Sequence, residues 1–350
     1  ILINPNIPES YFNLGLCYSK LNNLQLAIEN YSKAIKLNAH YHQAYINLGN
    51  LFKSNSLLDD AIKLYKNALT LLEKKDEIYV NLSDIYKIKK NFSESIRYAN
   101  KALNLNNRNY FALNNLGISL IETGRQKEAI AFLKKATEIN PKFAMTFANL
   151  GIAYRYDSQY DHAEDSYQKA IQSDPDFYDA YFNLGQIQLL QNKFNEGWQN
   201  YEYRWYKKEK APKKINFTKP YWNGELNGKR ILIWGEQGIG EQILFTNVFK
   251  DIINNFEKIL LLIDARLCRI FKENFPNIEV YPMSESIDEN LFDYHLPICS
   301  LGKFFRKESS NFLNSKHNFL NVNENKFDNK HKKIRCALSW KSANPDTGFS

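Results

Sequence analysis

Residues 41–71 read YHQAYINLGNLFKSNSLLDDAIKLYKNALTL, and this stretch decides the fold of the N-terminal part of the chain. Its first half contains the pair Leu48-Gly49, and its second half contains the small residues Ala61 and Ala68. Apolar residues recur at helical spacing in both halves, which predicts two helices joined by a short turn. Small residues would let these antiparallel helices approach closely, while leucine and aromatic residues fill the space around them.

The same pattern returns every 34 residues, so the sequence contains an internal repeat. A Leu-Gly pair, or Leu-Ser in one case, begins at Leu14, Leu48, Leu82, Leu116, Leu150 and Leu184. The later small residue is an alanine at Ala34, Ala68, Ala102, Ala136 and Ala170. Pro141 and Pro175 close two of the repeats, because proline stops a helix.

This spacing resembles that of the tetratricopeptide repeat. The resemblance covers residues 1–206 and implies an α-solenoid of six repeats with a concave face. Pro5 lies where a proline would close an earlier repeat, so we expect the array to be incomplete at its N-terminus.

The sixth repeat is irregular. Gly197 stands where the earlier repeats have alanine or serine, and Arg204 stands where they have the later alanine. Its second half is crowded with the aromatic residues Trp198, Tyr201, Tyr203, Trp205 and Tyr206. A terminal repeat departs from its neighbours because one side has no further repeat to stack on. We expect these aromatic residues to fasten the solenoid to the next domain.

Asparagine stands directly before each of the six pairs, at Asn13, Asn47, Asn81, Asn115, Asn149 and Asn183. Each amide can donate and accept a hydrogen bond, so this asparagine ladder could hold an extended peptide backbone. The ladder resembles the one that lines the repeat groove of O-linked N-acetylglucosamine transferases, which implies a protein or peptide partner. The alternative, that asparagine is simply common at this position of ordinary repeats, remains open.

The net charge of +8 is uneven, with 23 Lys/Arg and 17 Asp/Glu in residues 207–350. Residues 207–219 are basic and lack an apolar period, which predicts a linker. The sequence contains no motif that interleaves aromatic and basic residues, so we expect no nucleic-acid partner. The four cysteines and six histidines are scattered, so no metal site is expected. We predict a cytoplasmic protein with reduced thiols and no transmembrane segment.

Residues 220–333 alternate between apolar and amphipathic runs. The apolar runs predict strands at 231–234, 258–263, 278–281 and 293–296, and the amphipathic runs predict helices at 241–256 and 267–275. This alternation predicts a Rossmann-like α/β domain with a parallel sheet. Residues 334–350 begin with one more apolar run and then stop, so we expect them to open a second, truncated domain of the same kind.

The first predicted strand leads into a turn with three glycines, Gly235, Gly238 and Gly240. A P-loop requires Lys and Ser or Thr after its last glycine, and Glu241 excludes that motif. A dinucleotide fingerprint requires a third glycine where Ile243 stands. Asp264 could still bind a ribose, so a nucleotide-dependent oxidoreductase remains an alternative.

The order of strand, glycine-rich turn, acid and helix resembles the acceptor half of inverting glycosyltransferases of the GT-B type. Heptosyltransferases and their relatives linked to tetratricopeptide repeats are the most similar. The segments WNGELNGKRILIWGEQGIGEQ, FDYHLPICSLGKF and IRCALSWKSANP follow in the order of these relatives.

The resemblance implies that Glu241 is the general base, at the position where the relatives have an aspartate. It implies a nucleotide-sugar donor without a metal or other cofactor. Phosphate contacts are then expected in the glycine turn and, in the second domain, at Lys341, Ser342 and Asn344.

Together these features predict an α plus α/β protein: a tetratricopeptide solenoid followed by the first half of a GT-B glycosyltransferase. The repeats would bind a protein partner, and the full-length enzyme would transfer a sugar to a protein, peptide or glycan. The present chain lacks most of the donor domain, so we expect it to be inactive. The alternative is a scaffold whose transferase domain is degenerate. Glu236 is expected to be a turn residue and His295 a structural histidine.

Overall fold

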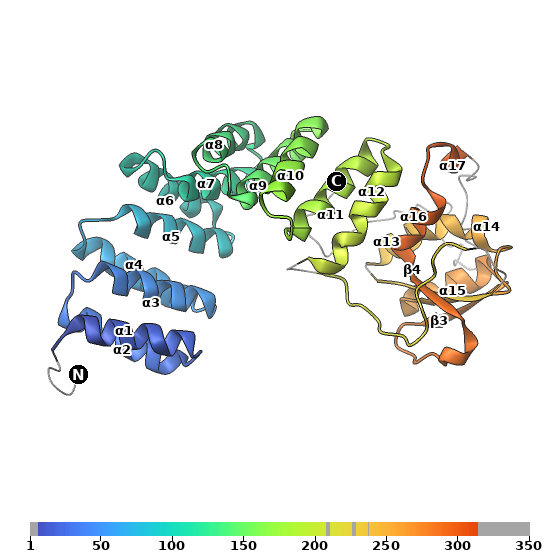
Figure 1. Ribbon diagram of the computed structural model, residues 1–350, viewed down its shortest axis with the longest axis horizontal. Helices are drawn as coiled ribbons and strands as arrows, with labels where there is room; N and C mark the ends of the chain where they lie inside the picture. The colour runs from blue at the N-terminus through green and yellow to red at the C-terminus, as the bar shows by residue number, and fades with distance from the viewer. Residues whose placement is uncertain (1–5, 208–210, 226–228, 237, 314–350) are drawn as a thin grey trace, which may run out of the picture. The chain divides into compact units, whose positions relative to one another are not determined.

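The computed structural model describes residues 6–207, 211–225, 229–236 and 238–313 (Figure 1). Its contacts divide the chain into two compact units, Ile1–Pro175 and Asp176–Ser350. The division falls one repeat before the boundary that the sequence indicates at residue 206. The sixth repeat therefore belongs with the sheet, and the contacts described below explain why.

The described residues of the first unit form helices in antiparallel pairs, one pair for each repeat (Figure 1). These helices are α1 (Pro8–Lys20), α2 (Leu24–Leu37), α3 (His42–Ser54), α4 (Leu58–Leu71), α5 (Asp76–Ile88), α6 (Phe92–Leu105), α7 (Tyr110–Glu122), α8 (Gln126–Ile139), α9 (Ala144–Tyr156) and α10 (Tyr160–Ser173). The first helices of neighbouring repeats also contact each other, as α5 contacts α7 and α7 contacts α9. The predicted helical solenoid is confirmed.

In the first unit, the glycine of each Leu-Gly pair is required by a large side chain 16 residues later. A Cβ atom on Gly49 would lie 2.2 Å from Cζ of Tyr65, and one on Gly151 would lie 2.7 Å from Cε1 of Tyr167. Such contacts are far shorter than van der Waals separations, so only glycine lets the two helices close over the ring.

The third repeat uses the opposite combination of sizes. Ser83 stands at the glycine position, and the residue 16 positions later is Ala99. Both residues are fully buried, and the Ser83 hydroxyl lies 3.2 Å from the Ser95 hydroxyl, within hydrogen-bond distance. A larger first residue is thus matched by a smaller second one.

The turn inside each repeat contains one residue in the left-handed region, at Asn22, Ser56, Lys90, Gly124 and Ser158 in the first unit. Only Gly124 adopts this conformation without a steric penalty, because it has no Cβ. Lys90 has a φ of 57° and a long side chain, and it is therefore the least suited residue of this set.

Replacing Lys90 by glycine should raise the free energy of unfolding by about 0.5–1 kcal/mol, since the left-handed penalty exceeds the entropy cost of glycine. Thermal unfolding followed by far-UV circular dichroism measures this change. The reciprocal variant Gly124→Lys should lower stability by a similar amount. A Lys90→Gly variant that is less stable than the parent would contradict the explanation.

The second unit begins with α11 (Tyr178–Leu190), α12 (Phe194–Tyr201) and the 3-10 helix η1 (Glu202–Tyr206). Its sheet consists of β1 (Arg230–Trp234), β2 (Lys258–Ile263), β3 (Ile278–Pro282) and β4 (Tyr294–Pro297). All pairs are parallel, and the order is β3-β2-β1-β4. The four strands agree with the predicted ranges to within one residue.

Short helices connect these strands: α13 (Ile239–Phe245), η2 (Thr246–Val248), α14 (Phe249–Ile252), α15 (Ala265–Asn274), η3 (Glu289–Leu291), η4 (Ile298–Ser300), α16 (Leu301–Phe305) and α17 (Ser310–Leu313). The single helix predicted over residues 241–256 is wrong, because it is interrupted at Thr246. The Thr246 hydroxyl donates to the Ile243 carbonyl at 2.6 Å, a local bond that competes with regular helix.

The central strand β1 is buried on both faces of the sheet. Ile231 and Ile233 lie in one apolar cluster, which also contains Trp198 and Tyr201 of α12. The Trp198 ring packs against Gly302, and its Nε1 donates to the Arg306 carbonyl at 2.7 Å. The sixth repeat thus shares its core with the sheet, as the aromatic residues led us to expect.

The opposite face of β1 packs against a second apolar cluster. Leu232 and Trp234 lie there with Trp205 of η1 and with Ile215 and Phe217. Residues 211–219 form no helix or strand, and the predicted linker at 207–219 stays a prediction. Two apolar side chains nevertheless anchor this segment to the sheet.

Candidate functional site

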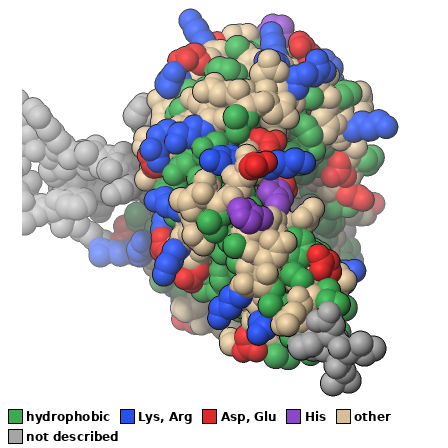
Figure 2. Space-filling model, turned by 90° about the vertical axis from the view of Figure 1, so that its left-hand side faces the viewer, with side chains coloured by type: hydrophobic (Ala, Val, Ile, Leu, Met, Phe, Trp, Pro, Cys, Tyr) green, Lys and Arg blue, Asp and Glu red, His purple; other side chains and the backbone are tan. Residues whose placement is uncertain are grey.

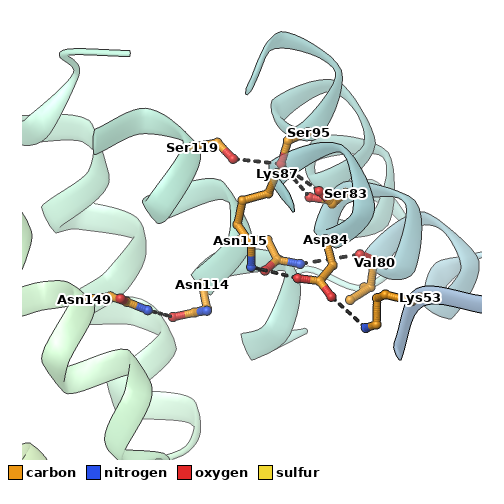
Figure 3. Close-up of polar contacts among 10 residues, drawn as sticks. All are labelled: Lys53, Val80, Ser83, Asp84, Lys87, Ser95, Asn114, Asn115, Ser119 and Asn149. Atoms are coloured by element: carbon orange, nitrogen blue, oxygen red, sulfur yellow. Dashed lines mark hydrogen bonds and ion pairs between the residues drawn. The ribbon is translucent and has the colours of Figure 1, made fainter. Parts of the chain in front are cut away.

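Charged side chains from neighbouring first helices meet at Asp84 in the first unit (Figure 3). Lys53 of α3 and Lys87 of α5 each place Nζ 2.7 Å from a carboxylate oxygen of Asp84. Lys87 also donates to the side-chain carbonyl of Asn115 at 3.0 Å. We call Lys53, Asp84, Lys87 and Asn115 the Asp84 cluster. Burial would raise the pKa of Asp84, but the two lysines outweigh it and lower the pKa.

Two members of the asparagine ladder are buried and bonded within the array. Asn115 donates to the Val80 carbonyl at 3.4 Å, and Asn149 donates to the side-chain carbonyl of Asn114 at 2.9 Å. Both amides therefore connect one repeat with the previous one (Figure 3).

The other ladder residues are more accessible. Asn13 is exposed, and Asn47, Asn81 and Asn183 are half-buried. Within the described residues, their side-chain amides take part in no hydrogen bond.

Figure 2 shows one face on which basic, acidic and hydrophobic side chains are interspersed. On this face, no broad area of a single charge favours a polyanion.

In the second unit, the glycine turn lies at the carboxyl end of β1, beside the carboxyl end of β4. The chain leaves β1 toward β2 and β3 on one side, whereas β4 lies on the other side. This reversal is a topological switch point, where open α/β sheets place their ligands. Gly235 and Glu236 follow β1 there, and η4 follows β4.

Glu236 forms a buried ion pair with Arg204 of the sixth repeat. Arg204 donates from Nε and Nη2 to the two carboxylate oxygens at 2.6 and 2.9 Å, and both side chains are 0% exposed. The backbone N–H of Cys299 donates to Glu236 at 3.1 Å. Arg204 also donates to Glu202 and to the Ser300 hydroxyl, each at 2.8 Å.

This network explains why Arg204 replaces the alanine of the other repeats. Burial would lower the pKa of Arg204, but the charges of Glu236 and Glu202 raise it above its ordinary value. Glu236 lies in the turn after β1, as expected, and its carboxylate is in addition a buried partner that fixes the sixth repeat to β1 and β4. The sequence carried two signals, an arginine in place of alanine and an acid in the glycine turn.

Of the three glycines of the turn, Gly235 is explained by a contact inside the protein. A Cβ on Gly235 would lie 2.7 Å from Cδ of Gln242, whose carbonyl accepts from the backbone N–H of Asp264 at 2.9 Å. A Cβ on Gly238 would lie 2.9 Å from Oε2 of Glu241. Gly240 is the second residue of α13.

Glu241 itself is half-buried in the first turn of α13. It forms no ion pair with another described residue. Its carboxylate lies at the glycine turn, where Oε2 would be 2.9 Å from a Cβ on Gly238.

Two further residues singled out in the sequence have structural roles. Asp264 caps α15 and binds Arg266 through both carboxylate oxygens at 2.9 Å, which lowers its pKa to about 2. This bonding disfavours a contact with a ribose. His295 is buried, accepts from Nε1 of Trp234 at 3.2 Å, and has its pKa lowered by burial, in agreement with a structural histidine.

The predicted contacts Lys341, Ser342 and Asn344, and the predicted second domain at 334–350, lie outside the described residues. Among the residues that are described, no group of three His, Cys, Asp or Glu side chains could hold a metal ion. No helix in the described part of the chain is both long and apolar enough to cross a bilayer.

Models of the tetratricopeptide repeat match residues 8–41, 76–109, 110–143, 144–177 and 166–199. The helical pairs are tetratricopeptide repeats. Protein FlbA of Caulobacter vibrioides is 32% identical to this chain over 98 residues, which are 27% of this chain and 16% of FlbA.

Solved structures share the fold of the tetratricopeptide repeats. A chain of the APC/C hetero-tetramer Cut9-Hcn1 matches with a TM-score of 0.52 and 21% identity, over 57% of this chain and 40% of that one. YrrB, described as a TPR protein with an unusual peptide-binding site, matches with a TM-score of 0.41 and 26% identity, over 51% of this chain and 93% of its own. The chain thus spans less than half the length of FlbA and of the Cut9-Hcn1 chain.

The tetratricopeptide array is a protein-interaction module, since stacked repeats of this kind present extended binding surfaces. The matched models end at residue 199, and the glycosyltransferase resemblance of the sheet stays a prediction. The Asp84 cluster could have been found from the sequence, because Lys53 and Lys87 are 34 residues apart and occupy the same position of neighbouring repeats.

Proposed function

We propose that the tetratricopeptide array binds an extended segment of a partner protein along its first helices. The observation that supports this proposal is the accessibility of Asn47 and Asn81, whose amides form no bond within the described residues. They lie at equivalent positions of α3 and α5. Each amide can hold one N–H and one C=O of a partner backbone.

In this proposal the asparagines of the ladder have two different roles. Asn115 and Asn149 connect neighbouring repeats and so fix the spacing of the surface. Asn13, Asn47 and Asn81 supply the free amides. Asp84 lies three residues after Asn81 on α5, and its cluster carries two cations against one carboxylate, which favours a partner segment with an acidic group.

Replacing Asn47 and Asn81 together by alanine should weaken binding of a selected peptide by about 2 kcal/mol, or roughly thirtyfold, because two amide contacts are lost. Peptides would be selected from a random library on the parent protein and measured by fluorescence anisotropy. Asn67 is exposed on the second helix α4, so Asn67→Ala is the matched control and should bind like the parent. Equal affinities for both variants would reject the ladder.

We propose for the sheet, in the full-length protein, transfer of a sugar from a nucleotide-sugar donor. The position of Glu241 supports this function, because its carboxylate lies at the glycine turn after β1 and forms no ion pair with another described residue. Glu241 would take the proton of an acceptor hydroxyl while the oxygen attacks the anomeric carbon and the nucleotide diphosphate leaves. The alternative remains a scaffold with a degenerate transferase domain, which the same experiment distinguishes.

Glu241→Gln in the full-length protein should reduce transfer at least about a hundredfold, because the amide cannot accept the proton. Donor binding should persist, since the shape of the side chain is kept. Turnover would be measured with a panel of nucleotide sugars, and donor binding by calorimetry. Glu225→Gln, at an exposed carboxylate, is the control. Unchanged turnover of Glu241→Gln rejects the base, and no donor binding by the parent favours the scaffold.

A further inference from the structure

Four tyrosine rings gather on one surface of the second unit, formed by α11 and η1. Tyr181 stacks on Tyr203 with ring centroids 4.2 Å apart, and Tyr178 lies 5.8 Å from Tyr203 and 5.4 Å from Tyr206. Tyr206 is 63% exposed, and the other three rings are half-buried. We call these four residues the tyrosine surface.

The tyrosine surface is distinct from the aromatic residues that hold the unit together. Trp198 and Tyr201 point into the core beneath the sheet, and Trp205 packs against Trp234. None of the four surface tyrosines belongs to these two clusters among the described residues. Clustered tyrosines that remain accessible are typical of binding surfaces.

Carboxylates flank these rings at the start of α11. The Tyr178 hydroxyl donates to Asp176 at 3.2 Å, and Asp179 follows in the first turn of the helix. Asp176 and Asp179 are the only charged residues between positions 176 and 192, so the carboxylates beside these rings meet no Lys or Arg of the same stretch.

We propose that the tyrosine surface binds a lysine- or arginine-containing segment of a partner protein. A cation is attracted to the face of an aromatic ring, and nearby carboxylates add to that attraction. The same part of the chain already uses this chemistry, since Nζ of Lys207 lies 4.5 Å from the centroid of the Phe182 ring. The inference depends neither on the asparagine ladder nor on the transferase.

The test measures binding of three probes to the whole chain by calorimetry: a peptide of alternating serine and lysine, one of alternating serine and glutamate, and maltoheptaose. The lysine peptide should bind, and the glutamate peptide should not. Tyr206→Ser and the pair Asp176→Asn with Asp179→Asn should each weaken the lysine peptide about five- to tenfold. Added salt should weaken it further.

Two controls match these changes. Tyr156 is 46% exposed on α9, so Tyr156→Ser removes a comparable ring elsewhere, and Glu196→Gln removes an exposed carboxylate of the same unit. Both should stay within twofold of the parent. If thermal unfolding shows that Tyr206→Ser is unstable, the pair Asp176→Asn with Asp179→Asn alone tests whether the lysine peptide binds this surface. The proposal is overturned if the lysine peptide does not bind, if the charge variants bind it normally, or if maltoheptaose alone depends on Tyr206.

Discussion

Replacing Arg204 by alanine should lower the free energy of unfolding of the second unit by about 3–5 kcal/mol. The variant leaves the carboxylate of Glu236 buried without its cation, and it removes the bonds to Glu202 and Ser300. Urea unfolding followed by tryptophan fluorescence measures this loss selectively. All five tryptophans of the chain lie beyond residue 175, so the signal reports only on the second unit.

A surface ion pair of the same unit provides the control. Arg266 is 74% exposed and pairs with Asp264, so Arg266→Ala should cost less than about 1 kcal/mol. The double variant Arg204→Ala with Glu236→Ala should lose about 2 kcal/mol less than the sum of the single variants, since it leaves no unpaired buried charge. If Arg204→Ala were as stable as Arg266→Ala, the ion pair would not be what holds the sixth repeat.

Gly49→Ala should destabilise the first unit by about 3 kcal/mol, the upper end of the range for overpacking, because its Cβ would overlap the Tyr65 ring. The cost depends on the facing ring, since the Tyr65 hydroxyl is also fixed by the Ile46 carbonyl at 3.2 Å. Far-UV circular dichroism during thermal unfolding provides the measurement.

The third repeat suggests the compensating change. Gly49→Ser combined with Tyr65→Ala reproduces its Ser83 and Ala99. The double variant should lose about 2 kcal/mol less free energy of unfolding than the two single variants lose together. Ser83→Gly is the control, because Ala99 leaves space there, and it should cost only about 1–2 kcal/mol from helix propensity and the lost hydrogen bond with Ser95. Additive effects of the first pair would show that the size match is incidental.

The sequence predicted the helical repeats and the four strands because both depend on short-range periodicity. It did not predict the size match of Gly49 with Tyr65, although the 16-residue interval is regular, because the contact only becomes evident when the helices are packed. The helix after β1 was predicted too long because a single side-chain bond at Thr246 interrupts it.

The candidate sites depend on contacts between distant residues and were therefore only partly predictable. All six ladder asparagines are alike in the sequence, but Asn115 and Asn149 are bonded within the array and Asn47 and Asn81 are not. Likewise, Glu236 and Glu241 lie close together in the sequence and look alike there. In the structure, Glu236 is buried against Arg204, whereas Glu241 is only half-buried and pairs with no described cation.

The Arg204–Glu236 pair also determines where the chain can be recombined. A chimera that exchanges the repeats and rejoins at residue 206 would replace Arg204 by a consensus alanine and leave Glu236 without its cation. Rejoining between Pro175 and Asp176 keeps both partners in one parental segment. The last helical pair must therefore be inherited together with the sheet.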